Sequence, residues 1–358
     1  MKTIPLIQFG LGGVGRAVVQ RVLASRDDFE WRYGLQLIYV AISDSRSAAI
    51  EPDGFSHAQL LTMLEAKAAG QSLADTEFGY ARGELTDIID VAGMDDAIVI
   101  DVTATEETTD ALLLALRRGY GAALANKKPL AGPMEAFRAL TGSGRLRYES
   151  TVGAGTPVIA MLRQAIIASH DPVQRIEGCF SGTLGFLTTG LEEGRSFSEL
   201  VTEARALGFT EPDPRDDLGG MDVARKALIL ARTLGWPLEL TNIPVEPLFP
   251  PELAEGSVDD FMAALPQLDE DYRQKVAAAR AQDKTLRYVA TLAEGQASVR
   301  LQEVPVASAL GQLRGSDNLA AFHTEVYNQT PLVLQGRGAG VHGTAAGVLA
   351  DIVALADK

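Results

Sequence analysis

Cysteine and histidine are scarce in this chain of 358 residues, which contains one cysteine and four histidines. The single cysteine, Cys179, excludes an intramolecular disulfide framework. The histidines (His57, His170, His323 and His342) are too far apart in the sequence for a zinc-binding pattern. A chain without disulfides suits a reducing compartment, and we expect a cytoplasmic protein.

Long apolar runs and concentrated positive charge are also missing. No stretch reaches the roughly 18 apolar residues that a membrane-spanning helix needs, and the N-terminus carries no signal-peptide cleavage pattern. The formal net charge is −15, with no cluster of Lys and Arg to neutralise phosphates. We therefore expect a small-molecule partner rather than nucleic acid or a membrane.

The composition is that of a globular protein with a sizeable core, because 46% of the residues are hydrophobic and 22% are charged. The length exceeds what one hydrophobic core usually supports, which predicts two domains. We expect the first over residues 1–150, completed by 331–358, and the second over residues 151–330.

Apolar segments alternate with helical patterns in the first 150 residues. Strands are expected at 3–9, 35–42, 97–103, 121–125 and near 149, and helices at 14–23, 57–69 and 107–118. The rest of residues 48–96 matches no clear pattern. Strands that alternate with helices predict an α/β fold with a Rossmann-type, doubly wound parallel sheet.

The pattern changes after residue 151. A long helix is expected over 153–169, a strand over 173–180, several helices through 234, and a hairpin over 285–305 that turns at Glu294 and Gly295. This order predicts an α+β domain. The last residues combine a strand at 331–335 with a helix at 344–356, which resembles the first domain and predicts a return to it.

A glycine-rich turn lies between the first strand and the first helix, in the order Gly10, Leu11, Gly12, Gly13, Val14, Gly15. Its G-x-G-x-x-G spacing in a strand–turn–helix context favours a dinucleotide pyrophosphate site over a mere tight turn. The choice between NAD and NADP stays open, because Asp44 could accept a ribose hydroxyl and Arg46 could pair with a 2′-phosphate.

A second group of polar residues lies in the run from Ala204 to Lys226, where a Pro-rich acidic loop precedes a helix that begins near Gly220. Apolar residues surround nearly the whole helix, which predicts that it is buried. Asp222 and Lys226 lie four residues apart on it. A solvated i,i+4 ion pair is the alternative, but a paired lysine on a buried helix indicates a functional site.

A third group is the run Asn126, Lys127, Lys128 at the end of a predicted parallel strand, with Thr103 at the end of the neighbouring strand. Ligands of open α/β sheets collect at this edge. Two solvated surface lysines are the alternative to a lysine that faces the cofactor.

Together these segments resemble homoserine dehydrogenase, the NAD(P)-dependent oxidoreductase that interconverts aspartate 4-semialdehyde and homoserine in threonine and methionine biosynthesis. The most specific match is the run that ends at Lys226. It contains the family pattern at these positions: Gly208, Phe209, Asp213, Pro214, Asp217, Leu218, Gly220, Asp222 and Lys226. The runs 125–127, 149–155, 338–340 and 344–351 are also similar.

The resemblance implies roles for individual residues. Lys226 and Lys127 would be catalytic, with Lys226 as the general acid in reduction and the base in oxidation. The substrate would be held by Gly208, Glu211, Asp217 and Asp222. The cofactor would be held by Gly10, Leu11, Gly12, Gly13, Val14, Gly15, Thr103, Lys127 and Gly340. A monovalent cation, sodium, would bind at Glu149, Val152, Ala154 and Thr156.

The resemblance also implies a homodimer formed through the sheet of the second domain. The chain is similar to the short members of the family, and no regulatory domain is expected after residue 358. Two rival functions stay open. Aspartate semialdehyde dehydrogenase would need Cys179 as a nucleophile, although we expect this cysteine to be buried. A non-catalytic dinucleotide sensor would leave Asp222 and Lys226 without a role.

Overall fold

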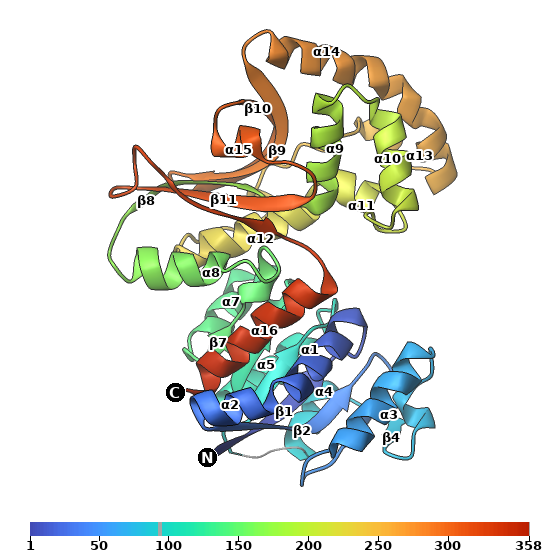
Figure 1. Ribbon diagram of the computed structural model, residues 1–358, viewed down its shortest axis with the longest axis vertical. Coiled ribbons are helices and arrows are strands. Elements are labelled where there is room, and N and C mark those ends of the chain that lie inside the picture. Colours follow the sequence, from blue (N-terminus) through green and yellow to red (C-terminus); the bar gives the residue numbers. More distant parts are fainter. Residues whose placement is uncertain (92–94, 358) are drawn as a thin grey trace. The chain divides into compact units, whose positions relative to one another are not determined.

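The computed structural model describes residues 1–91 and 95–357. The chain divides into two compact units, which we call unit 1 (residues 1–155 with 340–358) and unit 2 (residues 156–339). Each unit has its own sheet, as Figure 1 shows.

Unit 1 contains a seven-stranded sheet in the order β4-β3-β2-β1-β5-β6-β7. Its strands are β1 (Lys2–Phe9), β2 (Leu35–Ser43), β3 (Ser47–Ile50), β4 (Gly79–Ala81), β5 (Ile98–Asp101), β6 (Gly121–Leu124) and β7 (Leu146–Arg147). The five strands from β2 to β7 in this order are parallel, and β3 and β4 add an antiparallel edge. The central strands are apolar and buried, which parallel sheets covered on both faces require. The predicted fold class is confirmed.

The helices of unit 1 are α1 (Gly13–Ala24), α2 (Arg26–Tyr33), α3 (His57–Ala68), α4 (Leu85–Val91), α5 (Thr108–Arg117), α6 (Lys128–Ala131), α7 (Met134–Thr141) and α16 (Val341–Ala356). Short 3₁₀ turns are η1 (Leu73–Asp75) and η2 (Glu149–Thr151). Helices α1 and α16 pack on each other and share one apolar cluster with β1 and β5. Helix α5 packs against α4, α7 and strand β6. The last helix of the chain is therefore part of the first unit.

Unit 2 contains an antiparallel five-stranded sheet in the order β10-β9-β8-β11-β12. Its strands are β8 (Val173–Cys179), β9 (Lys284–Ala293), β10 (Gln296–Pro305), β11 (Asp317–Thr324) and β12 (Leu332–Arg337). The predicted hairpin is present. Its turn residues Glu294 and Gly295 have φ angles of 52° and 75°, the left-handed values that a type I′ turn requires.

The helices of unit 2 are α8 (Val158–Ala160), α9 (Gly182–Glu192), α10 (Phe197–Ala206), α11 (Arg215–Leu218), α12 (Met221–Thr233), α13 (Val258–Ala264), α14 (Asp269–Arg280) and α15 (Ala309–Gln312). A π-helical segment is η3 (Met161–Ile167), and short 3₁₀ turns are η4 (Leu240–Asn242), η5 (Pro251–Leu253) and η6 (Leu265–Leu268). Helix α12 begins directly after Gly220 and is buried along most of its length, as its pattern predicted.

One predicted element was wrong in its extent and another in the domain to which it was assigned. The helix expected from residue 153 begins only at Val158, because Gly153 and Ala154 have φ angles of 83° and 55°, which a right-handed helix cannot contain. The strand expected to complete the first domain, 331–335, belongs to unit 2. As β12 it pairs along its length with β11, so only α16 returns to unit 1.

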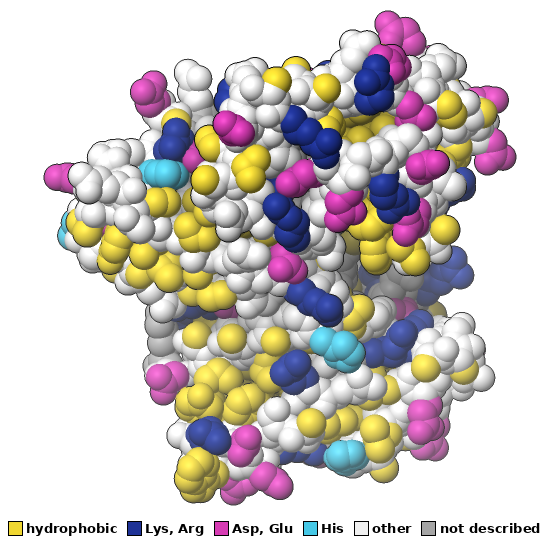
Figure 2. Space-filling model, turned by 45° about the horizontal axis from the view of Figure 1, so that its top comes forward, with side chains coloured by type: hydrophobic (Ala, Val, Ile, Leu, Met, Phe, Trp, Pro, Cys, Tyr) yellow, Lys and Arg dark blue, Asp and Glu magenta, His cyan; other side chains and the backbone are white. Residues whose placement is uncertain are grey.

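On the face drawn in Figure 2, acidic and basic side chains are interspersed, without a large patch of one sign. Among residues 1–91 and 95–357, no helix combines the length and the apolar character needed to cross a membrane.

A buried arginine ties the sheet of unit 2 to the segment that follows it. The side chain of Arg287 on β9 is 1% exposed. Its guanidinium donates to the carbonyl oxygens of Leu286, Leu310, Gly311 and Leu313 at 2.8–3.1 Å and pairs with Glu192 at 2.8 Å. One side chain thus satisfies several carbonyl groups that are closed off from water.

Replacing Arg287 with Met should lower the free energy of unfolding by about 3 kcal/mol, because buried carbonyl groups and Glu192 lose their donor. The matched control is Arg300→Met on the neighbouring strand β10, where the arginine is exposed. Urea unfolding followed by circular dichroism measures both variants. Equal losses in the two would contradict the structural role given to Arg287.

Candidate functional site

The glycine turn of unit 1 joins β1 to α1 through positions where a side chain would not fit. Gly10 has a φ angle of 99°, which favours glycine. A Cβ atom on Gly15 would lie 2.1 Å from the carbonyl oxygen of Gly10, so the absence of a side chain lets α1 approach the turn. A Cβ atom on Gly12 would meet nothing within 4 Å. The backbone at Gly12 is therefore open on the side from which a pyrophosphate would approach.

This turn lines a cavity of about 500 Å³ in unit 1, a size typical of ligand pockets. The lining residues include Gly10, Leu11, Gly12, Arg16, Ser43, Asp44, Lys67, Arg82, Thr103 and Glu107. The hydroxyl oxygen of Ser43 is buried and has no partner within the described part of the chain. A glycine cradle and an unpaired buried hydroxyl at one cavity fit a dinucleotide with polar ribose and phosphate groups.

The remaining residues predicted to bind the cofactor are not part of the lining of this cavity. Gly13, Val14 and Gly15 form the first turn of α1. Gly340 precedes α16 with a φ angle of 108°, and Lys127 precedes α6. Neither Gly340 nor Lys127 lines the cavity. Contacts of all these residues with a cofactor stay predictions.

Asp44 is held by a lysine that the sequence reasoning missed. One carboxylate oxygen accepts the main-chain N–H groups of Arg46 and Ser47 at 2.9 and 2.8 Å, and the other pairs with Lys67 at 2.7 Å. Burial raises the pKa of Asp44, but the hydrogen bonds from Lys67, Arg46 and Ser47 outweigh it and bring the pKa to about 2. Arg46, the proposed partner of a 2′-phosphate, is exposed and does not line the cavity.

Lys226 in unit 2 is a buried lysine with two oxygen partners. The residue is 8% exposed. Its ammonium group donates to the carbonyl oxygen of Phe180 at 2.5 Å and pairs with the carboxylate of Asp222 at 2.8 Å. The side chain of Asp222 is 44% exposed, so the pair is buried at its lysine end and open at its carboxylate end. This geometry differs from a solvated surface pair.

The acidic loop before α12 brings the predicted substrate residues together. The carboxylate of Asp217 accepts the main-chain N–H of Glu211 at 2.7 Å and the hydroxyl of Thr183 at 3.3 Å. Burial is the main cause that raises the pKa of Asp217. The two hydrogen bonds oppose this increase, and the negative charges of Glu211 and Asp222 add to it. Gly208, at the start of the loop, has a φ angle of 70°.

Two residues that no sequence motif indicated hold this loop in place. The hydroxyl of Thr183 lies 2.7 Å from the carbonyl oxygen of Phe209, so its one hydrogen is shared between this oxygen and the carboxylate of Asp217. Arg215 donates to both carboxylate oxygens of Asp213 and to the carbonyl oxygens of Ala254 and Gly256 at 2.7–3.1 Å. Such contacts depend on segments far apart in the sequence, so a linear pattern cannot contain them.

The residues predicted to bind a cation follow β7. Glu149 is 7% exposed and begins the turn η2, and its main-chain N–H donates to the carboxylate of Asp351 at 2.8 Å. Val152 and Ala154 are also buried. Thr156 is the first residue of unit 2, whereas the other three residues belong to unit 1.

Comparison with known proteins tests the resemblance. The family model for the homoserine dehydrogenase NAD-binding domain matches residues 10–145, and the homoserine dehydrogenase model matches residues 157–353. The chain belongs to the homoserine dehydrogenase family. The two models meet close to the boundary between the units, so the family accounts for both.

Individual relatives agree with this assignment. A bifunctional aspartokinase/homoserine dehydrogenase of Haemophilus influenzae is 36% identical over 98% of this chain. A homoserine dehydrogenase of Paracoccidioides brasiliensis is 39% identical over 73% of this chain and 75% of its own length. A hyperthermophilic archaeal homoserine dehydrogenase variant, solved with NADPH, has 25% identity and a TM-score of 0.77, covering 98% of this chain and 97% of its own. The chain spans 43% of the Haemophilus protein.

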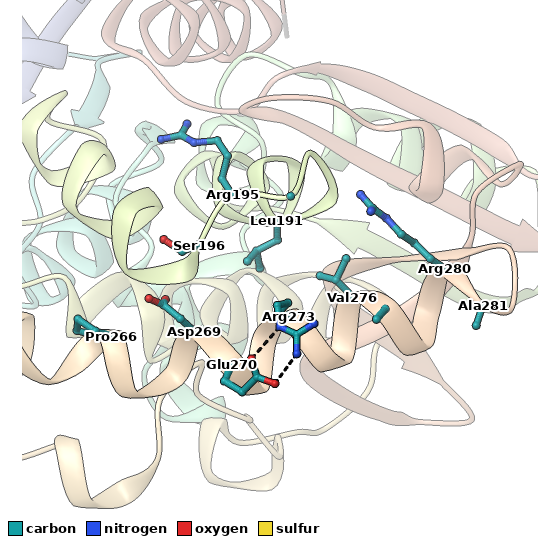
Figure 3. Close-up of a pocket in the computed structure, with 12 residues that line it drawn as sticks. Leu191, Arg195, Ser196, Pro266, Asp269, Glu270, Arg273, Val276, Arg280 and Ala281 are labelled. Atoms are coloured by element: carbon teal, nitrogen blue, oxygen red, sulfur yellow. Dashed lines mark hydrogen bonds and ion pairs between the residues drawn. The ribbon is translucent and has the colours of Figure 1, made fainter.

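Two features of this family member lie outside the predicted site. Cys179 is buried, and burial raises the pKa of its thiol to about 12, so it is unsuited to nucleophilic attack. A cavity of about 850 Å³ in unit 2 is lined in part by Leu191 of α9 and Val276 of α14, which Figure 3 labels. It contains none of the predicted substrate residues, and its Arg273 pairs with Glu270.

Replacing Gly12 with Ala should weaken cofactor binding about tenfold or more without lowering the melting temperature, because the added methyl group meets no protein atom but stands where the pyrophosphate approaches. Gly15→Ala is the matched variant. It should lower both affinity and melting temperature, because its methyl group strikes the Gly10 carbonyl. Fluorescence titration with NADPH and NADH measures affinity. Wild-type affinity in Gly12→Ala would rule out the cradle.

Proposed function

We propose that this protein catalyses the NAD(P)H-dependent reduction of L-aspartate 4-semialdehyde to L-homoserine and the reverse oxidation. Family membership supports the reaction, and the buried pair of Lys226 and Asp222 is the observation that carries the mechanism. In this proposal the glycine cradle of unit 1 holds the cofactor and the acidic loop of unit 2 holds the amino acid.

Lys226 is the proposed proton donor in reduction. A bound nicotinamide cofactor supplies the hydride, so the protein must supply the proton that completes the alcohol. The ammonium of Lys226 carries three hydrogens. The carbonyl of Phe180 and the carboxylate of Asp222 accept two of them, which leaves the third for the substrate oxygen. In oxidation the neutral amine would take the proton back.

The carboxylates of unit 2 suit the ammonium group of the substrate. Glu211 precedes α11 and Asp217 lies on α11, and a cation bound beside them would offset the unfavourable burial of Asp217. Arg215 keeps this loop attached to the segment at 254–256. Gly208, Glu211, Asp217 and Asp222 are therefore the proposed substrate-binding residues, with Lys127 and Thr103 on the side of the cofactor.

A monovalent cation and a partner subunit are further parts of the proposal. The buried residues Glu149, Val152 and Ala154 of unit 1 support the proposed sodium site, and replacing sodium by choline should then lower the activity. A homodimer would cover exposed apolar residues near the edge of the unit 2 sheet, such as Val326 and Val333. Sedimentation equilibrium measures whether the protein is a dimer.

The cytoplasm is the proposed compartment, and threonine and methionine biosynthesis is the proposed pathway.

Replacing Lys226 with Ala should lower kcat about 100-fold or more and leave cofactor affinity nearly unchanged, because the variant lacks the proton donor. The matched control is Lys275→Ala on α14. Lys275 also pairs with an aspartate four residues earlier, Asp271, at 2.7 Å, but its side chain is 45% exposed. NAD(P)H oxidation with aspartate semialdehyde measures both. Near-normal turnover in Lys226→Ala would reject this role.

The same assay separates the rival functions. A dinucleotide sensor would bind the cofactor in the wild-type protein without turning over the aldehyde. An aspartate semialdehyde dehydrogenase would require phosphate and the thiol of Cys179, which the structure buries. Phosphate-independent reduction of the aldehyde by both wild type and Cys179→Ser supports the proposed function over both rivals.

A further inference from the structure

A buried carboxylate links the ends of two neighbouring parallel strands in unit 1. Asp101 ends β5 and is 0% exposed, and Asn126, two residues after β6, is 2% exposed. The main-chain N–H groups of Ala125 and Asn126 both donate to the carbonyl oxygen of Asp101, at 2.9 and 3.2 Å. The pairing of the strands therefore continues past their ends and places the Asn126 side chain beside the Asp101 carboxylate.

The two side chains share a closed set of hydrogen bonds. One oxygen of Asp101 accepts the main-chain N–H and the hydroxyl of Thr103, at 3.0 and 2.7 Å. The other accepts the amide of Asn126 at 3.0 Å. The amide of Asn126 also lies 3.1 Å from the Thr103 hydroxyl and 2.7 Å from the Thr105 carbonyl oxygen. Hydrogen bonding by the Thr108 side chain also lowers the pKa of Asp101, against the effect of burial.

A contribution to stability alone does not explain this set of hydrogen bonds. Burial raises the pKa of Asp101, although the donors from Thr108, Thr103 and Asn126 oppose the increase. A raised pKa in the folded state means that this group stabilises the fold when protonated and loses that contribution as the pH rises through the folded pKa. Ionisation of this carboxylate in the folded protein therefore costs stability. Two carboxylate oxygens can, however, hold Thr103 and Asn126 at once.

The residues that are held are those predicted to act. Thr103 lines the 500 Å³ cavity, and its methyl group lies 3.2 Å from the position that a Cβ atom on Gly10 would occupy. The side-chain oxygen of Asn126 accepts the main-chain N–H of Lys128 at 3.1 Å. The main-chain N–H of Asn126 donates to the carbonyl oxygen of Asp101. The main chain is therefore fixed on both sides of Lys127.

We propose that Asp101 and Asn126 are positioning residues, which set Thr103 against the cofactor cavity and fix the main chain from which Lys127 extends. For Lys127 this inference rests on the proposed function. For Thr103 it concerns only the binding of the cofactor, which can be measured without turnover. Neither Asp101 nor Asn126 lines the cavity.

The decisive variant is Asn126→Asp, which keeps the size of the side chain and replaces a donor with an acceptor. Its new carboxylate would face Asp101 across the 3.0 Å that now separates donor and acceptor. Two carboxyl groups that close share one proton, and one of their pKa values is strongly raised. Protonation restores a donor between them, so the defect should grow as the pH rises and shrink as the pH falls.

Other charged groups must be considered in the pH dependence. Arg16, Arg82 and Glu107 line the same cavity as Thr103, and Lys127 and Lys128 follow Asn126 in the chain. None of them is a cause of the raised pKa of Asp101, and all are present in both wild type and variant. The ratio of variant to wild type at each pH therefore isolates the new carboxylate.

The experiment measures NADPH and NADH affinity by fluorescence titration, with kcat where turnover is found, for wild type and Asn126→Asp from about pH 6 to about pH 8. We expect affinity to fall about fivefold or more at the alkaline end and the variant-to-wild-type ratio to recover at the acid end. The control is Asn242→Asp at the exposed last residue of the 3₁₀ turn η4 in unit 2, which should show a ratio near one throughout.

A ratio that is near one for Asn126→Asp, or reduced equally at every pH, overturns the proposal. If circular dichroism shows that this variant does not fold, Thr108→Val decides instead, because it removes one donor to Asp101 and keeps the shape of the side chain. A loss of about threefold or more in affinity then supports the proposal, and wild-type affinity rejects it. Absence of turnover in the wild type would reject the proposed function alone.

Discussion

The chemistry proposed for this protein depends on one buried interaction, the ammonium of Lys226 between the Phe180 carbonyl and the Asp222 carboxylate. An unpaired ammonium in this place would be strongly unfavourable. Helix α12 satisfies it by placing Asp222 one turn before the lysine, and β8 contributes the carbonyl directly after its last residue. In the segment before α12, the main-chain N–H of Glu211 donates to the carboxylate of Asp217 on α11. A solvated lysine would require none of these contacts.

Unit 1 follows a different rule, in which polar groups collect where parallel strands end. The glycine turn follows β1, Asp44 follows β2, Asp101 ends β5 and Asn126 follows β6. Parallel neighbours place these ends along one edge of the sheet, and the cavity lies there. Loops at such an edge can vary in sequence while the buried strands keep the positions of their ends. The proposed positioning by Asp101 and Asn126 fixes the main chain beyond the last residue of β6.

Much of this arrangement could be predicted from the sequence because its signals are local. The glycine spacing, the alternation of strands and helices, and the apolar residues around α12 each lie within one continuous segment. The hairpin turn at Glu294 and Gly295 is local as well, and it was found where it was expected. The family pattern before Lys226 is also continuous, and the family models confirm the assignment that it suggested.

What could not be predicted depends on residues far apart in the chain. Lys67 reaches Asp44 across 23 positions, and Asn126 reaches Asp101 across 25. Strand β12 has the apolar pattern of many strands, and only its pairing with β11 decides that it belongs to unit 2. The prediction of a helix from residue 153 was wrong at its start because the backbone angles of Gly153 and Ala154 cannot be inferred from their side chains.

The proposed reaction transfers a hydride from the nicotinamide cofactor to the aldehyde carbon of aspartate semialdehyde. Its most direct test is reduction of aspartate semialdehyde with NADPH that carries deuterium on one face of the nicotinamide C4, followed by mass spectrometry of the product. Both faces should be tried in separate reactions. The account predicts homoserine with one deuterium at its new alcohol carbon from one of the two labelled cofactors. Homoserine without deuterium from both, or no homoserine at all, would contradict it.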